Sequence, residues 1–434
     1  MATDRKIFEL QQKLYLKSKQ EYDFKFYSIF DKIYRKDILL QSYQKCRANK
    51  GGAGVDNITF AMIDKKGVEE FVDNLSLELK NNNFKPSPVK RVEIPKADGK
   101  VRLLGVPTIK DRVVQMAIKL MIEPIYEAVL HPNSFGYRPK RSAGEAVVQI
   151  AKNLNEGYTT VYDADLSKYF DTIPHQKMME KLERKISDYK VLNLIRKFLK
   201  APIQITNHNG NKEMLSNRQG VGTPQGGVIS PLLANIYLND FVTLINEKTP
   251  CRLISYADDF VIMHKENFTD EQLGWFVKCI EREGLTINLQ KTSVVDTTVV
   301  GSLFNFLGFA FKRVRSIYNP IKGYIRIEPS TKAIKKFKKA IADIVKHKTS
   351  RTMQMMIAKI NPIIRGWMNY FGYIGNFRDI FVKLDGYINH RFYQWAKRLS
   401  HRPNKSFMQN SWEILAKNGL ILLRLGRANV KGLR

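Results

Sequence analysis

Two adjacent aspartates, Asp258 and Asp259, stand between two short runs of β-forming residues. Residues 252–255 and 260–263, joined by a tight connection, predict a β-hairpin that places both carboxylates at its tip. Because neighbouring carboxylates repel each other, a divalent cation would explain their position, and Mg²⁺ is typically held by one or two carboxylates and substrate phosphates. The ordinary interpretation of an isolated Asp pair is a solvated turn.

A second acidic segment, TTVYDADLSKYF at residues 159–170, predicts a strand that ends near a turn. Asp163 and Asp165 project from the same face of that strand, so their spacing does not distinguish them. Asp171 or Thr172 is expected to cap a helix that begins near Pro174. A carboxylate on one strand that faces a carboxylate pair on a neighbouring hairpin is the arrangement that two-metal phosphoryl transfer requires.

The charge of the chain indicates a polyanionic partner. Its 434 residues include 72 Lys and Arg against 41 Asp and Glu, a formal net charge of +31. This balance favours nucleic acid and excludes an acidic disordered protein. Residues 312–434 alone hold 27 Lys and Arg against five Asp and Glu, so the first 311 residues carry only +9. At about 150 residues per domain, the length suggests roughly three domains.

The cysteines and the apolar runs suggest a location. Cys46, Cys251 and Cys279 form no CxxC pair, which argues against a zinc ribbon and fits a reducing cytosol. The charged N-terminus lacks the apolar region of a signal peptide, and no apolar run approaches the length of a membrane span. We therefore expect a bacterial cytoplasmic protein with no membrane partner.

Two helices are predicted in the basic C-terminal region. In residues 331–349 Ile334, Phe337 and Ile341 follow helical spacing, Ser330 or Thr331 can act as N-cap, and the lysines fall mostly on the other face. A second helix is expected at 384–399. A lysine-rich face on one helix is ordinarily a solvated surface, but the surplus over the whole region favours nucleic acid. The glycine cluster at 50–56 lacks the P-loop Lys-Ser/Thr and predicts a turn.

Several long motifs resemble one family. YADD at 256–259, GTPQGGVISPLLANIYL at 222–238, and the segments 92–115 and 134–147 are similar to motifs of reverse transcriptases. NPIIRGWMNYF at 361–371 resembles the thumb, or maturase X domain, of group II intron-encoded reverse transcriptases. The resemblance runs in order from about residue 14 to about residue 400. It indicates the bacterial type that lacks an endonuclease, since the residues after 400 contain no cysteine.

The resemblance implies a set of site residues. In the family the first catalytic Asp precedes a Phe-Asp pair, as in DLSKYFD, which selects Asp165 over Asp163. Asp165, Asp258 and Asp259 then resemble the catalytic triad that holds two Mg²⁺ ions, with Mn²⁺ as a substitute. Phe170 matches the steric gate against a ribose 2′-hydroxyl. The other residues that match nucleotide contacts are Lys96, Arg102, Gln225 and Lys291, and Gly226 and Gly227 are expected to let the backbone approach the nucleotide.

Further cations are candidates for nucleic-acid binding. Arg138, Lys140 and Arg141 precede a capping-box pattern, Ser142 to Glu145, which predicts a helix start. They are expected to contact the template backbone. The candidates in the thumb are Lys335, Lys336, Lys339 and Arg365.

The expected fold is α+β: a right-hand polymerase, whose palm has a small antiparallel sheet, followed by an all-α thumb. The predicted domains are an N-terminal extension (1–63), fingers and palm (64–311), the thumb or maturase X domain (312–400) and a short basic segment with a role in DNA binding (401–434).

The implied function is RNA-directed DNA polymerisation, with binding of structured intron RNA that aids splicing and mobility. The expected partners are group II intron RNA, an RNA template with a DNA primer, dNTPs and a DNA target. Two alternatives remain open: a domesticated reverse transcriptase in phage defence or CRISPR spacer acquisition, and a maturase that only binds RNA. Nothing in the sequence sets the oligomeric state.

Overall fold

The computed structural model describes residues 2–95, 101–206, 211–216, 220–315, 323–346, 351–372, 377–399 and 405–425. The chain forms two compact units that are discontinuous in sequence. The first contains residues 1–141, 164–261 and 268–293, and the second contains residues 142–163, 262–267 and 294–434.

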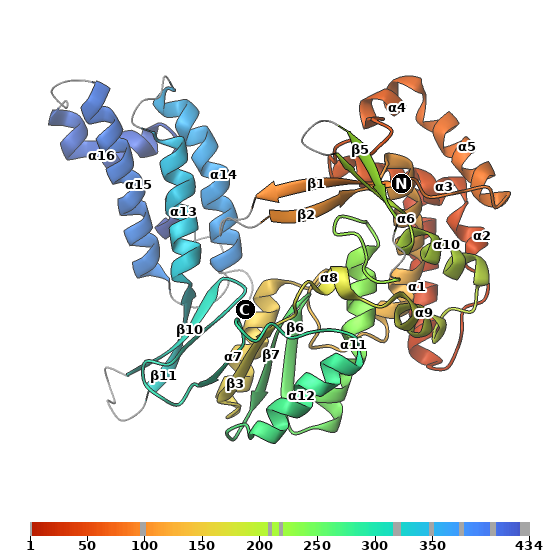
Figure 1. Ribbon diagram of the computed structural model, residues 1–434. Coiled ribbons are helices and arrows are strands. Elements are labelled where there is room, and N and C mark those ends of the chain that lie inside the picture. The colour runs from red at the N-terminus through yellow and green to blue at the C-terminus, as the bar shows by residue number, and fades with distance from the viewer. Residues whose placement is uncertain are drawn as a thin grey trace. The chain divides into compact units, whose positions relative to one another are not determined.

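Helix α6 (Ile109–Glu127) is the core of the first unit. Its side chains are buried along most of its length, and Val113, Ala117 and Ile118 are fully buried. It contacts α1 (Ala2–Gln20), α2 (Phe30–Ile33), α3 (Lys36–Ala48) and α11 (Ser230–Lys248). The unit also contains α4 (Phe60–Lys66), α5 (Val68–Lys80), α8 (Tyr169–Thr172), α9 (His175–Glu183), α10 (Tyr189–Leu199) and α12 (Asp270–Arg282) (Figure 1).

A mixed four-stranded sheet belongs to the same unit. Its order is β2 (Val101–Val106), β1 (Val89–Pro95), β4 (Ile203–Thr206) and β5 (Lys212–Leu215). Strands β1 and β2 are antiparallel, with Val92 opposite Leu104, whereas β1 and β4 are parallel. The hairpin predicted within 92–104 is therefore confirmed, although its expected turn at Asp98 and Gly99 lies outside the described residues.

The two acidic segments belong to a second four-stranded sheet. Its order is β6 (Arg252–Tyr256), β7 (Asp259–His264), β3 (Thr160–Asp165) and β8 (Ser293–Asp296). The predicted hairpin with Asp258 and Asp259 at its tip is confirmed. The strand that carries Asp165 is the neighbour of β7, which confirms that the two acidic segments lie on adjacent strands.

The second unit ends in helices. After α7 (Ala143–Asn155) come the antiparallel strands β9 (Leu303–Phe306), β10 (Phe309–Arg315) and β11 (Gly323–Pro329). They are followed by α13 (Thr331–Ile344), α14 (Met353–Phe371), α15 (Arg378–Leu399), α16 (Lys405–Lys417) and a 3₁₀ turn, η1 (Leu423–Leu425). Helix α13 contacts both α14 and α15 and lies between them in Figure 1. The buried carboxylate of Asp385 accepts hydrogen bonds from the amides of Leu423 and Arg424 and fixes η1 on α15.

The helix predictions hold with changed bounds. Ser330 caps α13 by accepting a hydrogen bond from the amide of Ala333, and Phe337 and Ile341 are buried as expected. The helix ends at Ile344 rather than at residue 349, and α15 begins six residues before the predicted 384. The mixed α/β composition with small sheets agrees with the predicted class. Residues 312–400 are not all-α as predicted, however, because strands β10 and β11 extend to Pro329 and the helices begin only at Thr331. The assignment to fingers, palm and thumb stays a prediction, as do the domain boundaries.

The predicted cap of the helix near Pro174 is wrong. Asp171 and Thr172 lie in α8, and Pro174 is the N-cap residue of α9, with no side-chain hydrogen bond. The amide of His175 donates instead to the carbonyl of Gly220, 2.8 Å away. A backbone acceptor from a distant loop therefore replaces the expected side-chain cap. None of the helices in the described ranges is long and apolar enough to cross a membrane.

Two segments of the first unit that are distant in sequence meet at Asp188, and we call this contact the joint at Asp188. Phe26 pairs with Ile186 in an isolated parallel bridge. The carboxylate of Asp188, which is 8% exposed, accepts hydrogen bonds from the amides of Ile29 and Phe30, both at 2.8 Å. The same side chain caps α10 through the amides of Lys190 and Val191. One buried carboxylate thus satisfies donors separated by about 160 residues in sequence.

Asp188→Ala removes the acceptor of four backbone donors. We expect the variant to lose about 2–4 kcal/mol of unfolding free energy, because a lost N-cap costs about 1 kcal/mol and a buried unpaired donor about 1–3 kcal/mol. Urea unfolding measures the loss, and hydrogen exchange at the α10 amides locates it. The control is Asp73→Ala, which breaks only an exposed ion pair with Lys36. An equal loss of unfolding free energy in the two variants would contradict a stabilising role for Asp188.

Candidate active site

Three carboxylates from two adjacent strands converge in the first unit. Asp165 is the last residue of β3, and Asp258 and Asp259 stand at the turn between β6 and β7. Removal from water, followed by the charges of Asp258 and Asp165, raises the pKa of Asp259 to about 6, although part of the residue is open to solvent. Burial also raises the pKa of Asp258, and the charge of Asp165 adds to that effect. The three groups therefore act on one another as a cluster.

Lys291 provides the closest positive charge. Its Nζ donates to Oδ2 of Asp165 at 2.6 Å, and this hydrogen bond raises the pKa of Lys291. The backbone places the lysine there, because Leu166 pairs with Ile287 in an antiparallel bridge and the amide of Asn288 donates to the carbonyl of Asp165 at 2.8 Å. The structure thus brings together Lys291 and the predicted triad.

The segment 133–136 supports the turn that carries Asp258 and Asp259. The amide of Ser255 donates to Asn133, and the amide of Phe135 donates back to Ser255 at 2.9 Å. Gly136 then lies against Ala257, whose φ of 60° is left-handed, and a Cβ on Gly136 would overlap the backbone nitrogen of Ala257. The side chain of Asn235 on α11 donates to the carbonyl of Gly136 at 2.7 Å. The turn is therefore held by direct backbone packing.

Phe170 lies beside the same turn. Its ring is 5.6 Å from that of Tyr169 and 6.5 Å from that of Tyr137, both edge-to-face. Tyr169 is buried and its hydroxyl donates to the carbonyl of Ala234 at 2.6 Å, which gives Phe170 a fixed neighbour. The carbonyl of Phe170 accepts from the amide of Thr223 at 2.7 Å, so the loop with Gln225 is joined to the segment with Phe170.

The two glycines after Gln225 lie where the loop packs closely on its neighbours. The carbonyl of Gln225 accepts from the amide of Gly105 in β2 at 2.6 Å. Gly226 has a φ of 112°, and a Cβ there would overlap the carbonyl of Gly105, whereas a Cβ on Gly227 would meet the hydroxyl of Ser230. Their small size lets the loop pack on β2 and on α11, and their approach to a nucleotide stays a prediction. The side chain of Gln225 is half-buried.

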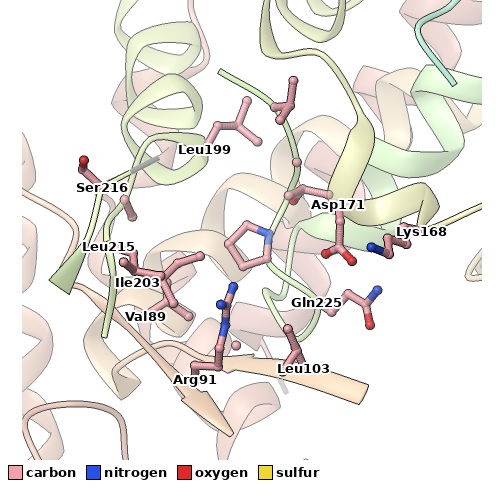
Figure 2. Close-up of a pocket in the computed structure, with 16 residues that line it drawn as sticks. Val89, Arg91, Leu103, Lys168, Asp171, Leu199, Ile203, Leu215, Ser216 and Gln225 are labelled. Carbon is pink, nitrogen blue, oxygen red and sulfur yellow. The ribbon is translucent and has the colours of Figure 1, made fainter. Parts of the chain in front are cut away.

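A cavity of about 590 Å³ opens next to Gln225. Figure 2 shows Val89, Ile203 and Leu215 on one side of it and Asp171, Lys168 and Gln225 on the other. Arg91 and Leu103 from the β1–β2 hairpin form part of the wall. The cavity is mainly apolar with charged groups at one end, and its size is within the range of small-ligand sites.

The remaining nucleotide candidates are cations on the β1–β2 hairpin. Arg102 on β2 is exposed and close enough to Asp258 to lower its pKa against the effect of burial. It is also near Asp171 and Tyr137, whose pKa values it lowers in the same way. Arg102 therefore faces the aspartate cluster. Lys96 lies outside the described residues.

Arg138 is bound within the protein, which contradicts its predicted contact with nucleic acid. Its side chain is 5% exposed and pairs with Glu127 at 2.7 Å. It also donates to the carbonyls of His131 and Ser134, both at 2.7 Å. A guanidinium with its donors used in this way positions the segment 133–136, which supports the turn between β6 and β7. Lys140 is exposed, and Arg141 packs on the ring of Phe135 at 4.3 Å, so for these two the prediction stands untested.

The thumb candidates are all solvent-exposed in the second unit. Lys335, Lys336 and Lys339 lie on α13 away from the buried Phe337 and Ile341, and Arg365 lies on α14. Their exposure is compatible with binding to a polyanion. Ser142 caps α7 through the amide of Glu145, as the capping-box pattern predicted.

The donor chemistry of the cluster suits a hard divalent cation, because Mg²⁺ and Mn²⁺ prefer carboxylate oxygens. Burial, with a smaller effect of neighbouring carboxylates, raises the pKa values of Asp258 and Asp259, so a cation bound there would stabilise their charged forms. Within the described ranges, however, no three His, Cys, Asp or Glu side chains are arranged to hold a metal ion, and Lys291 binds Asp165 directly. The residues fit the cation by type, while the arrangement shown is not a closed metal site.

Sequence reasoning missed Tyr137. Its φ of 57° is unusual for a bulky residue, its side chain is 51% exposed, and its ring lies against Phe170. Burial raises the pKa of Tyr137, and the nearby charge of Asp258 adds to that effect. The only signal in the sequence is the preceding Gly136, whose close packing allows this backbone path. Left-handed bulky residues of this kind often mark functional sites.

Two families match separate parts of the chain. Residues 94–311 match the family described as "Reverse transcriptase (RNA-dependent DNA polymerase)". Residues 334–412 match the family described as "Group II intron, maturase-specific domain". The first match covers all the described members of the aspartate cluster together with Lys291, Phe170 and Gln225.

Curated relatives differ in how much of their length is shared. Protein YkfC of Escherichia coli (strain K12) is 30% identical over 361 residues, which are 73% of this chain and 91% of YkfC. Group II intron-encoded protein LtrA of Lactococcus lactis subsp. cremoris is 35% identical over 227 residues, 51% of this chain and 36% of LtrA. The putative COX1/OXI3 intron 2 protein of Saccharomyces cerevisiae is 35% identical over 213 residues, 49% of this chain and 24% of that protein. The match thus spans most of YkfC but only a minor part of the other two.

Gly136→Ala tests whether packing of Gly136 holds the turn between β6 and β7 in place. The added Cβ would overlap the backbone of Ala257, so we expect β6 and β7 to shift and the amides of residues 252–264 to lose protection from hydrogen exchange. Overpacking of this kind costs about 1–3 kcal/mol. The matched control is Gly274→Ala in α12, where a Cβ meets nothing within 4 Å, and we expect it to be neutral or stabilising. Unchanged protection in Gly136→Ala would show that the contact is unimportant.

Proposed function

This chain belongs to the reverse transcriptase family and carries a group II intron maturase-specific domain, and we propose that it copies RNA into DNA at Asp165, Asp258 and Asp259. The family assignment confirms the resemblance found in the motifs. The observation that carries the proposal is the convergence of three carboxylates on adjacent strands, where burial, and then the charges of Asp258 and Asp165, raise the pKa of Asp259 to about 6. Such a cluster is unfavourable unless positive charge is brought to it.

The proposed reaction is a nucleotidyl transfer from a dNTP to the 3′-hydroxyl of a primer. Two Mg²⁺ ions, or Mn²⁺ in their place, would activate that hydroxyl and stabilise the leaving pyrophosphate when bound by the three aspartates. Arg102 would hold the triphosphate, since a guanidinium fork matches phosphate oxygens. Lys291, whose pKa is raised by its hydrogen bond to Asp165, remains protonated at neutral pH and would donate a proton to the pyrophosphate.

Phe170 and Gln225 would select the nucleotide. The ring of Phe170 has Tyr169 and Tyr137 against it, so it has little room to move away from a 2′-hydroxyl. Gln225 stands at the edge of the cavity beside Asp171 and would contact the incoming nucleotide. Lys96 keeps its expected role on the triphosphate from its motif alone.

We further propose that the protein binds structured group II intron RNA and aids splicing and mobility at a DNA target. The exposed cations Lys335, Lys336, Lys339 and Arg365 support this, because they face solvent in a region with a large positive surplus. Lys140 and Arg141 would add contacts to the template backbone. Binding would depend mainly on counterion release and weaken steeply with salt.

In this proposal the first unit holds the fingers and most of the palm, and α13 to α15 form the thumb. A bacterial cytoplasm is the expected location, where thiols stay reduced. The three cysteines support this, since Cys46, Cys251 and Cys279 are buried free thiols.

Asp258→Asn tests the chemistry. We expect the rate of primer extension on an RNA template with Mg²⁺ and dNTPs to fall by roughly a hundredfold to a thousandfold or more, because one anionic ligand is lost. Binding of RNA should remain nearly intact. Asp165→Asn should have the same effect.

The matched control is Asp163→Asn, two residues from Asp165 on the same strand. It should extend the primer at close to the wild-type rate. If Asp163→Asn were the inactive variant and Asp165→Asn the active one, the assignment would be reversed. A wild-type protein that extends no primer would refute the proposed function.

Phe170→Ala or Phe170→Val tests the sugar gate. We expect ribonucleotide incorporation relative to deoxynucleotide incorporation to rise by roughly tenfold to a hundredfold, since a small side chain leaves space for the 2′-hydroxyl. Competition between rNTPs and dNTPs in primer extension measures the ratio. Phe170→Tyr keeps the ring and should keep the discrimination. Unchanged sugar selection in the alanine variant would remove Phe170 from this role.

A further inference from the structure

The three most exposed aromatic side chains of the described residues lie in one region of the first unit. Tyr22 is 73% exposed, Tyr27 is 72% exposed and Tyr189 is 70% exposed, whereas the next aromatic, Phe8, is at 54%. We call the first three the tyrosine patch. None of them contributes to the aspartate cluster or to the cavity beside Gln225. Exposed aromatics gathered on a surface ordinarily mark a binding site.

The joint at Asp188 brings the patch together. Phe26 is buried in its bridge with Ile186, and Tyr27 follows it directly in the chain. Tyr189 follows Asp188 as the first residue of α10. Figure 1 shows α2 and α10 close together, as the hydrogen bonds of Asp188 require. Both tyrosines are thus held outward by neighbours that are anchored in the core.

Lysines stand beside the aromatic rings. Nζ of Lys185 lies 4.6 Å from the centre of the Tyr22 ring and donates to the Tyr22 carbonyl. Nζ of Lys190 lies 5.6 Å from the Phe30 ring. Of the nearby acids, Glu21 pairs with Lys17, Asp31 pairs with Lys32, and Asp23 acts on Lys185. Residues 17–35 and 183–200 together hold eleven Lys and Arg against five Asp and Glu, so the region keeps a net positive charge.

A small cavity continues the patch along α10. Its volume is about 290 Å³, and its walls include the rings of Phe30, Phe84 and Tyr189. Lys190, Asn193 and Lys197 also line it, and they share one face of α10 with Tyr189. The site therefore combines flat apolar walls, an amide that can hydrogen-bond to a base edge, and two ammonium groups.

We propose that the tyrosine patch, with Lys190 and Lys197, binds unpaired nucleotides of a structured RNA, while the buried Lys185 holds Tyr22 in place. Splayed bases stack on exposed aromatic rings, and adjacent lysines neutralise the phosphates between them. A protein partner fits less well, because lysine is depleted at protein–protein interfaces and here lysines lie beside Tyr22 and Tyr189. The proposal rests on the proposed function only for the choice of RNA, and it places this contact apart from the copying site.

The test compares two fluorescent RNAs of equal length: a stem-loop with an adenosine-rich unpaired loop, and a blunt duplex. In the full chain carrying Tyr27→Ala and Tyr189→Ala, we expect affinity for the stem-loop to fall by about fivefold or more, since each base–aromatic stack is lost on truncation. Affinity for the duplex should not change. Tyr27→Phe with Tyr189→Phe keeps both rings and should keep the affinity.

Substitution of a lysine should affect RNA binding differently from substitution of a tyrosine. Lys190→Gln should weaken binding of both RNAs and reduce the slope of log affinity against log salt by about one, because one phosphate contact is removed. The matched control is Phe8→Ala, the next most exposed aromatic, which should bind both RNAs like the wild type. Crosslinks from 4-thiouridine in the loop should fall on residues 22–27 and 189–197.

Two results would overturn the proposal. One is a double alanine variant that binds the stem-loop like the wild type, and the other is an equal loss for stem-loop and duplex. Primer extension on a short template should be unaffected by the double substitution. A wild-type protein that binds the stem-loop through the patch but extends no primer would refute the proposed polymerase function and leave this site in place.

Discussion

Repulsion between three carboxylates is the constraint around which the first unit is organised. Asp165, Asp258 and Asp259 would separate if their backbones were free, and burial makes their charge still less favourable. Lys291 offsets part of this through its ion pair with Asp165. The repulsion that Lys291 does not offset is opposed by the packing of the β6–β7 turn. The segment at Gly136 packs directly on this turn, and the ion pair of Arg138 with Glu127 holds that segment.

The rigidity comes from contacts between backbones. No side chain fits at two positions. Gly226 packs against Gly105 and joins its loop to β2, and Gly136 packs against Ala257 and joins its segment to the β6–β7 turn. A bound metal ion would therefore meet carboxylates whose main chain is already fixed, so that only side-chain rotation remains. This is the physical content of preorganisation, in which the fold rather than the substrate meets the energetic cost of assembling the site.

Much of the site could be predicted from the sequence, because its residues stand in continuous motifs. The hairpin with Asp258 and Asp259, the strand of Asp165 and the helix capped by Ser330 all follow from local patterns. The predictions that were wrong concern residues whose hydrogen-bond partners are distant in the sequence. Arg138 is occupied by Glu127 and two carbonyls, and α9 is capped by the loop at Gly220, and neither partner can be identified from local spacing. Tyr137 was missed because a left-handed backbone leaves no mark on residue type.

The sequence separation within the joint at Asp188 has a consequence for synthesis. The amides of Ile29 and Phe30 emerge from the ribosome about 160 residues before the carboxylate that binds them, an interval of roughly ten to thirty seconds at ordinary rates of translation. During that time the N-terminal segment has no partner for its bridge at Phe26. Tyr27 and Tyr189 can therefore act as one surface only after the chain has been made to the end of α10. An RNA that needs both tyrosines would be ignored by the nascent chain and recognised by the finished one.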